Sequence, residues 1–567
     1  MKTIIIGCLL FLTGTLCFSQ STNPVNIFEG YTINDVRVVF TNPPEDTILT
    51  DSYRKIIEQQ FAVHRGAHYN ASMAGFYNSR INLLPFVQQS VVTLSNETAS
   101  EVTITLNVTL LEKTEQKKLE SGFKNKSVLP TLINTERFYL TLQASASEMV
   151  FSNNNAWFGN PVAMTTGNPL ATNPAGKGMT AWLEGFGSAG IYSVFNLIPK
   201  IKLHIYGGAS YIASFSAGNE LFTTRSRIHG GLEDAFIGFV GGDNLKNGKK
   251  YLYNITYGRK SFVLGDGFLL INTSMNGYDR AALQLNPRWA AKELFTGVFQ
   301  WNKWMLQGFN VRPNELDILN SKTVLRGLNT QFTDKEYGTA GFTLMTSPKS
   351  NFSYYLPDGT VHKRKGLQVY NLRYYRLPTD KLGLLFKGEV AFERNTNFDM
   401  KAWAYYIEAG WQFKKAFGSP NISYRYASFS GDDPDTKAYE RWDALYTGGN
   451  GEQWVQGSNM YKVFQNSNEL THRFQAVFSP AKKLQLVGQF WVFLADQKNN
   501  IGGNPALSAL DSRFLGTEYN LTMKYFISRH WYFHFNTAYT VPGKGIRSAL
   551  SGSKDWFSIM GFIRYSF

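Results

Sequence analysis

The sequence predicts an antiparallel transmembrane β-barrel of about 16–18 strands, preceded by a small N-terminal α+β domain. Three observations predict this fold class. The chain begins with a secretory signal pattern, its composition is rich in aromatic residues and low in charge, and it ends in an alternating strand closed by an aromatic residue. Together they indicate a multi-pass protein of the Gram-negative outer membrane.

Residues 1–20 have the layout of a cleavable secretory signal. Ile4–Phe18 form its apolar core, which is too short and too poorly flanked to be a membrane anchor. Lipidation is the alternative, because the residues before Cys8 resemble a lipidation site, but Cys8 has almost no apolar core ahead of it. Both cysteines, Cys8 and Cys17, lie in this segment. The mature chain is therefore predicted to have no disulfide and no cysteine-based metal or catalytic site.

The composition is that of a barrel more than of an ordinary soluble domain. Aromatic residues make up 15% of the chain and charged residues only 17%, against about 25% charged in typical soluble domains. After the signal there is no apolar run of about 18 residues, so no transmembrane helix is predicted. Many aromatics and glycines without helical spans suit a barrel with aromatic girdles. A soluble β-sandwich or propeller shares part of this profile, so the C-terminus decides between them.

The last residues alternate as a strand between lipid and lumen should. Counting back by twos from the terminal aromatic gives an apolar set: Phe567, Tyr565, Ile563, Gly561, Ile559 and Phe557. The other set contains the polar side chains: Ser566, Arg564, Phe562, Met560 and Ser558. One face suits a bilayer and the other an aqueous interior. A terminal aromatic closing such a strand resembles the assembly signal of bacterial outer-membrane proteins.

Residues 21–130 differ from the rest and predict a periplasmic α+β domain followed by a linker at 112–126. The pattern is strand, helix, helix, strand, strand: Ile33–Phe40, about Thr50–Phe61, Ala71–Leu84, Phe86–Leu94 and Glu101–Leu111. This order, with Gly66 between the helices, resembles a POTRA module. A generic α+β domain is the alternative. The resemblance implies a periplasmic or outer-membrane protein partner, because POTRA modules bind extended segments at a sheet edge.

Residues 131–567 are predicted to form the barrel, since short period-2 segments alternate there with polar, glycine-rich connections. Five stretches in it resemble the alginate-export porin family: Gly231–Phe239, Ile255–Phe268, Ile422–Pro434, Arg441–Gly449 and Ala538–Gly545. The chain departs from that family's pattern at Lys260, where glutamine is usual, at Trp442, and in having the N-terminal domain. The resemblance implies an outer-membrane barrel that transports or exports a hydrophilic solute.

Strand parity predicts which polar side chains face the lumen. The pore-lining candidates are Lys202, His204, Arg259, Arg373, Lys387, Glu389, Arg425, Lys524 and Arg564. The formal net charge of +15 favours anionic solutes or an anionic polysaccharide, because a basic lumen concentrates anions. Alternatively, the excess basic residues lie in loops and bind outer-membrane lipid and lipopolysaccharide. No nucleic-acid partner is expected.

Two function classes therefore remain. The first is a passive channel for hydrophilic, anionic solutes, and the second is an accessory barrel that binds protein partners during outer-membrane assembly or secretion. An enzyme is disfavoured, because neither a His-Glu-x-x-His motif nor a nucleophile elbow occurs. Asp432, Asp433 and Asp435 resemble part of a calcium loop but lack its later bidentate glutamate. Neither a metal nor a cofactor is predicted.

Overall fold

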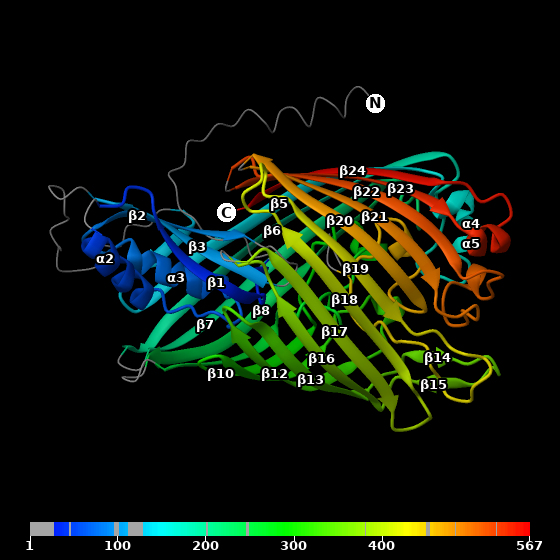
Figure 1. The fold of residues 1–567 in the computed structure, drawn as a ribbon, viewed down its shortest axis with the longest axis horizontal. Helices are drawn as coiled ribbons and strands as arrows, with labels where there is room; N and C mark the ends of the chain where they lie inside the picture. Colours follow the sequence, from blue (N-terminus) through cyan, green and yellow to red (C-terminus); the bar gives the residue numbers. More distant parts are fainter. Residues whose placement is uncertain are drawn as a thin grey trace.

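The computed structural model describes residues 28–44, 47–95, 101–111, 129–199, 202–244, 249–379, 382–448, 454–481, 483–528 and 530–566. Figure 1 shows a small unit at one end of a closed barrel. The predicted signal at 1–20, the predicted linker at 112–126 and the terminal Phe567 lie outside the described residues.

The N-terminal unit, residues 28–111, has the predicted element order. It consists of β1 (Thr32–Phe40), α2 (Thr47–Gln60), α3 (Ala71–Ile81), β2 (Val87–Ser95) and β3 (Glu101–Leu110). The sheet order is β1-β3-β2, with β1 parallel to β3 and β2 antiparallel to it. Alternation along β3 buries Val102, Ile104 and Leu106 against the helices, where they form one apolar core with Ile57 and Ile81.

Two helix boundaries differ from the prediction. Helix α2 begins at Thr47, earlier than the expected start near Thr50, and α3 ends at Ile81 instead of Leu84. The early end of α3 has a local cause, because the Asn82 side chain accepts from the backbone N–H of Ser90 at 2.6 Å. That bond turns the chain from the helix toward β2, at a residue type that favours caps and turns.

Eighteen antiparallel strands close the barrel, within the predicted number. They are β5 (Phe138–Asn154), β6 (Met179–Ile198), β7 (Leu203–Gly218), β8 (Arg227–Asn244), β9 (Lys250–Arg259), β10 (Glu293–Trp301), β11 (Trp304–Arg312), β12 (Val324–Asp334), β13 (Gly338–Lys349), β16 (Leu367–Arg376), β17 (Leu384–Asn395), β18 (Ala402–Gln412), β19 (Asn421–Phe429), β20 (Glu469–Ala481), β21 (Leu484–Ala495), β22 (Phe514–Tyr525), β23 (Trp531–Pro542) and β24 (Trp556–Ser566).

Closure occurs where β24 pairs with β5, from Phe557 opposite Asn154 to Ser566 opposite Ser145. The short strand β4 (Thr131–Asn134) adds only to the beginning of β5. Connections at one end of the barrel are short, at most eight residues, whereas most of those at the other end are longer. The long ones carry the helices α4 (Pro161–Met164) and α5 (Lys544–Ala549) and the hairpin of β14 (Ser353–Tyr355) and β15 (Val361–Lys363). The N-terminal unit lies at the short-turn end (Figure 1).

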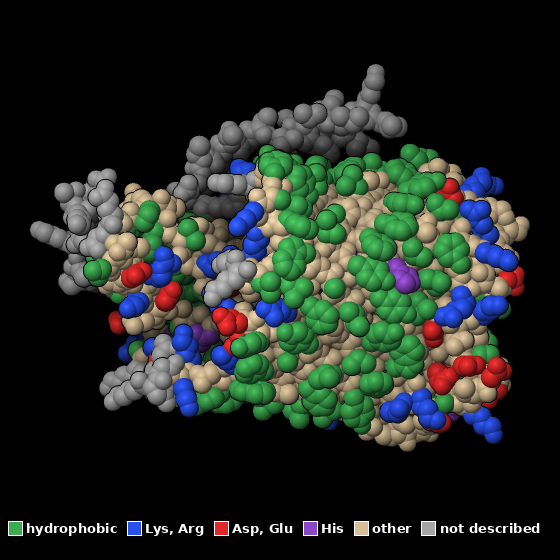
Figure 2. Space-filling model, viewed as in Figure 1, with side chains coloured by type: hydrophobic (Ala, Val, Ile, Leu, Met, Phe, Trp, Pro, Cys, Tyr) green, Lys and Arg blue, Asp and Glu red, His purple; other side chains and the backbone are tan. Residues whose placement is uncertain are grey.

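The outer face of the barrel is apolar, as the alternation predicted. Outward side chains such as Leu306, Leu328 and Leu372 are more than half exposed, at 52%, 57% and 58%. Figure 2 shows apolar side chains over the middle of the barrel and charged ones gathered toward its ends. Exposed aromatics, including Trp301 and Trp304, lie at the short-turn end, as in the girdle of a membrane barrel. No helix in the described part of the chain is long and apolar enough to cross a bilayer.

The barrel interior is packed with side chains from the wall and from the loops. One apolar cluster joins wall residues such as Phe309 and Tyr406 to Phe268 and Trp454 from long loops. A second cluster lies around Trp157, Trp491 and Trp556. Since loop residues fill both clusters, the long loops fold into the barrel.

Candidate functional site: a filled lumen

A loop that folds into the barrel, residues 260–292 between β9 and β10, carries a buried carboxylate, Asp266, that helps to hold it in place. Asp266 accepts from Lys387 Nζ at 2.9 Å and from the Tyr406 hydroxyl at 2.6 Å. It also accepts from Trp454 Nε1 at 3.2 Å. Strands β17 and β18 supply the first two donors, and the loop between β19 and β20 supplies the third. We call residues 260–292 the inward loop. Asp266 thus joins the inward loop, the barrel wall and a second loop.

Two further carboxylates from the wall bind the backbone of the inward loop. Glu184 of β6 accepts from the N–H groups of Gln284 and Leu285 at 3.0 and 2.9 Å. Glu233 of β8 accepts from the N–H groups of Trp289 and Ala290, both at 2.7 Å. Both glutamates are buried. These bonds satisfy backbone donors that would otherwise be buried without partners.

The predicted residues Arg373, Lys387 and Glu389 come together on the inner wall of β16 and β17. Arg373 is 2% exposed and donates to Thr343 Oγ1 at 2.9 Å and to Asn329 Oδ1 at 2.6 Å. Glu389 accepts from Asn371 Nδ2 at 2.8 Å and from the Tyr375 hydroxyl at 2.5 Å. Strand alternation places these side chains inward together.

Arg425, also predicted, lies beside a second arginine on the inner wall. Its cross-strand neighbour is Arg473, which pairs with Glu408 at 2.5 Å. Arg425 is 3% exposed, and its guanidinium lies 4.6 Å from the Trp454 ring centroid. Among the described residues no carboxylate pairs with Arg425, so aromatic rings supply its cation–π contacts.

The other candidates lie elsewhere. Arg259 donates to the Glu233 carbonyl at 2.8 Å, near the inward loop. Lys202 lies in a short turn, just before β7 begins at Leu203, and pairs there with Asp243 at 2.7 Å. The remaining three lie in strands. His204 of β7 is buried, whereas Lys524 of β22 and Arg564 of β24 are half-buried.

The N-terminal unit closes over the short-turn end of the lumen. Met73 and Phe76 of α3 pack in one buried cluster with Tyr139, Val194 and Tyr206 of the barrel wall. The Phe76 ring also lies 5.2 Å from that of His204, between centroids. His204 therefore faces the N-terminal unit and not an open aqueous lumen.

Buried polar contacts add to this apolar interface. Glu29 pairs with Lys260 of the inward loop at 2.7 Å, with 9% of each side chain exposed. Glu29 also accepts from the N–H of Ala71, at the start of α3, at 2.8 Å. Arg80 of α3 donates to Asn134 Oδ1 at 2.7 Å and to the Thr135 carbonyl at 2.6 Å. The Glu29–Lys260 pair therefore joins the N-terminal unit directly to the inward loop.

Acid is expected to weaken the N-terminal unit. Burial, followed by the charges of Lys250 and Lys202 at the short-turn end of the barrel, lowers the pKa of His64 to about 4. Burial also lowers the pKa of His68. An unfolded histidine has a pKa near 6.5, so as the pH drops below that value the unfolded state binds a proton that the folded state does not. The contribution of His64 to the free energy of unfolding is therefore fully present above pH 6.5 and falls by up to about 3 kcal/mol as the pH drops toward 4. Thermal unfolding of the helical circular dichroism at pH 7, 5.5 and 4 measures this loss.

His64→Gln should lose most of that pH dependence, and the double variant with His68→Gln nearly all of it. His362→Gln, in the β14–β15 hairpin far from the N-terminal unit, is the control and should behave like the wild type. A double variant as acid-sensitive as the wild type would show that other groups are responsible.

Several residues that hold the filled lumen are not among the candidates that the sequence predicted. They are Asp266 and Trp454 of the long loops, Glu184 of β6 and Glu29 of the N-terminal unit. Gly265-Asp266-Gly267, within a stretch that carries the family resemblance, was the available signal. Among the described residues, no group of three or more His, Cys, Asp or Glu side chains is placed to hold a metal ion.

The sequence of the chain matches one protein family over much of the barrel. The family described as alginate export matches residues 223–555, which is more than half of the chain. No curated protein sequence matches significantly. Crystal structures of Pseudomonas aeruginosa OccK9 (OpdG) and OprD are similar at 10% and 9% identity, each with a TM-score of 0.44, covering 76% of this chain and 98% and 95% of theirs. The crystal structure of Acinetobacter baumannii OccAB4 is similar at 10% identity with a TM-score of 0.43, and the match covers 75% of this chain and 97% of that one.

These structures are too distant to indicate a solute, and the family assignment comes from the sequence match. The match begins within the barrel and does not include the N-terminal unit. The chain belongs to the alginate export family and is an outer-membrane channel protein, not an enzyme.

Proposed function

We propose that this protein is a channel for passive transport or export of hydrophilic anionic solutes, and that the N-terminal unit closes its lumen in the state described. The buried Glu29–Lys260 pair carries this proposal, because it places the N-terminal unit against the inward loop inside the barrel. Removing one partner of a buried ion pair is costly, because the other charge is then buried without a partner. The closed state is therefore held by specific contacts, which have to separate before a solute passes.

The orientation follows from the connections. Bacterial outer-membrane barrels have short periplasmic turns and long extracellular loops, so the short-turn end faces the periplasm. The N-terminal unit is accordingly periplasmic, and it closes the channel from that side. The predicted signal at residues 1–20 is consistent with this placement.

The preference for anions rests on the inner wall. Arg425 and Arg473 are cross-strand neighbours there, and one carboxylate, Glu408 of β18, lies opposite Arg425 and pairs with Arg473. Arg373 of β16 adds a cation, whereas the charge of Lys387 of β17 is paired with Asp266 of the inward loop. A lumen with this balance attracts anions once water enters it. Anionic sugars and polysaccharides are within this class.

A second function is favoured by the sheet of the N-terminal unit. Its element order supports the POTRA-like assignment, and among the described residues β2 pairs only with β3, which leaves an edge available for strand addition. The barrel would then be an accessory component that binds protein partners during outer-membrane assembly or secretion.

Ion selectivity tests the channel proposal. The full-length mature protein in a planar bilayer, under a salt gradient, should pass current whose reversal potential shows a preference for anions. Arg425→Gln should reduce the anion-to-cation permeability ratio by about twofold or more, since this arginine has no described carboxylate partner to compensate. Arg225→Gln, an exposed loop arginine paired with Asp279, is the control.

A preference for cations would contradict the proposal. Absence of current both in the full chain and in a variant lacking residues 28–111 would also overturn it, and would favour the protein-binding function.

A further inference from the structure

An unbroken row of polar side chains crosses the lipid-facing surface near the long-loop end. Cross-strand pairing places Asn310 of β11 beside Arg326 of β12, Arg326 beside Thr346 of β13, Thr346 beside Gln368 of β16, and Gln368 beside Arg394 of β17. All five share the outward parity of the apolar belt. A polar row on a face that is otherwise apolar needs a partner other than acyl chains.

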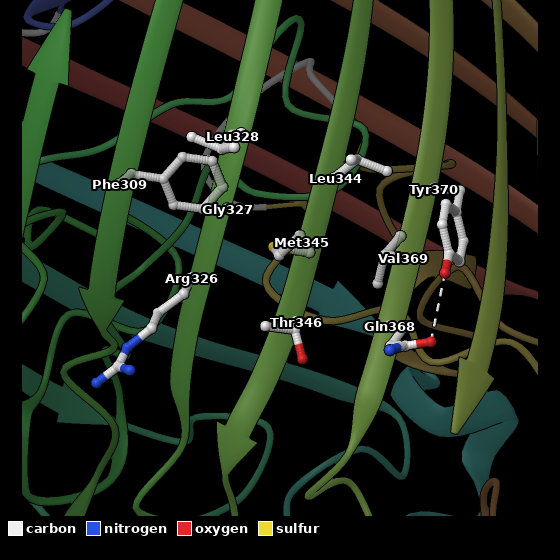
Figure 3. A pocket seen from close by; sticks show the side chains of 10 residues that line it. All are labelled: Phe309, Arg326, Gly327, Leu328, Leu344, Met345, Thr346, Gln368, Val369 and Tyr370. Atoms are coloured by element: carbon white, nitrogen blue, oxygen red, sulfur yellow. Dashed lines mark hydrogen bonds between the residues drawn. The ribbon is translucent and has the colours of Figure 1, made fainter. Parts of the chain in front are cut away.

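Three members of the row, Arg326, Thr346 and Gln368, form one side of a shallow depression in the outer wall. Its volume is about 410 Å³, and Figure 3 shows Arg326, Thr346 and Gln368 at one level across three strands. The apolar side chains Leu328 and Leu344 lie at the next level, toward the middle of the barrel (Figure 3). The depression therefore has a polar rim on its long-loop side and an apolar surface on its membrane side.

The rim is basic. Arg326 and Arg394 are both exposed, and among the described residues neither forms an ion pair with a carboxylate. Arg326 is held by Asn310, whose Oδ1 accepts from its Nε at 2.8 Å. The nearby Arg312 differs, because Glu293 pairs with it at 2.6 Å. Arg326 thus presents positive charge to the depression itself, and Arg394, beside the lining residue Gln368, presents a second positive charge just beyond it.

We propose that this depression binds a glycolipid with two phosphates, of the lipopolysaccharide type, in the outer leaflet. Arg326 and Arg394 are three inter-strand spacings apart, or about 14 Å, which suits two phosphates separated by a disaccharide better than one phosphate. Thr346 and Gln368 between them offer hydrogen bonds to sugar, and Leu328 and Leu344 contact acyl chains. Arginine binds phosphate through paired, charge-assisted bonds. The inference rests on the orientation proposed above.

Native mass spectrometry of the full-length protein in detergent tests the site, with diphosphorylated lipid A, its monophosphorylated form and phosphatidylglycerol as probes. The diphosphorylated lipid should bind at least about tenfold more tightly than phosphatidylglycerol. The variant Arg326→Gln/Arg394→Gln should lose that advantage, and removing one phosphate should reproduce part of the loss. Arg225→Gln is the matched control, as an exposed arginine at the same end but outside the row.

Equal binding of phosphatidylglycerol, or unchanged lipid A binding by the double variant, would overturn the inference. Conductance of the double variant separates it from the channel proposal: an anion-selective current with no lipid preference contradicts only the lipid site.

Discussion

A disulfide between positions 66 and 333 is expected to lock the channel shut. A Cβ atom placed on Gly66 would lie 3.5 Å from the Cβ of Thr333 on β12, which is within the range that disulfides require. The oxidised variant Gly66→Cys/Thr333→Cys should pass at least about tenfold less current than its reduced form, because the cross-link joins the N-terminal unit to the wall. Planar-bilayer recordings before and after addition of a reducing agent measure this difference.

Each single-cysteine variant serves as a control and should show no response to the reducing agent. Cys8 and Cys17 lie in the predicted signal, so its removal is expected to leave no native thiol that competes. Gly66 has a φ of +80, so the cysteine adds strain of roughly 1–2 kcal/mol. Equal currents in the oxidised and reduced double variant would show that the N-terminal unit does not need to move.

Asp266→Leu is expected to destabilise the filled lumen by about 3–5 kcal/mol. The substitution removes the acceptor shared by Lys387, Tyr406 and Trp454 and leaves the Lys387 ammonium, 6% exposed, buried without its carboxylate. The inward loop should detach from the wall. Chemical denaturation of the refolded protein measures the loss of stability, and single-channel recordings should show larger, less steady currents.

Removing the lysine as well provides the control. In Asp266→Leu/Lys387→Met no unpaired charge remains, so more than half of the lost stability should return, although the hydrogen bonds of Tyr406 and Trp454 stay broken. If the free energy of unfolding of Asp266→Leu lies within about 1 kcal/mol of the wild-type value, Asp266 does not hold the loop. The single and double variants will then have the same stability.

Much of the architecture was predictable because it depends on local patterns. The outward set of β24, for example Phe557 and Ile563, is exposed, whereas Ser558 and Phe562 are buried, as the period of two required. The order of elements in the N-terminal unit followed from similar periodicities. Parity also placed Arg373, Lys387 and Arg425 on the inner wall. Whether they line a conducting pore stays a prediction.

Parity failed where no strand exists or where another element covers the wall. Lys202 was assigned to a strand but lies in the turn before β7, paired with Asp243. His204 does point inward, yet it meets Phe76 of α3. Neither outcome is encoded in the five residues around those positions, since the first depends on turn length and the second on docking of a distant helix.

The sequence by itself determined the barrel, its approximate strand number, the N-terminal α+β unit and the family, because each rests on periodicity or on motifs of neighbouring residues. Only the tertiary structure decided that the lumen is filled and which side chains hold it closed. Asp266 and Lys387 are 121 residues apart. Glu29 and Lys260 are separated in the sequence by the rest of the N-terminal unit and by the strands from β5 to β9. Such contacts depend on how long loops fold back into the interior, which side-chain alternation does not specify.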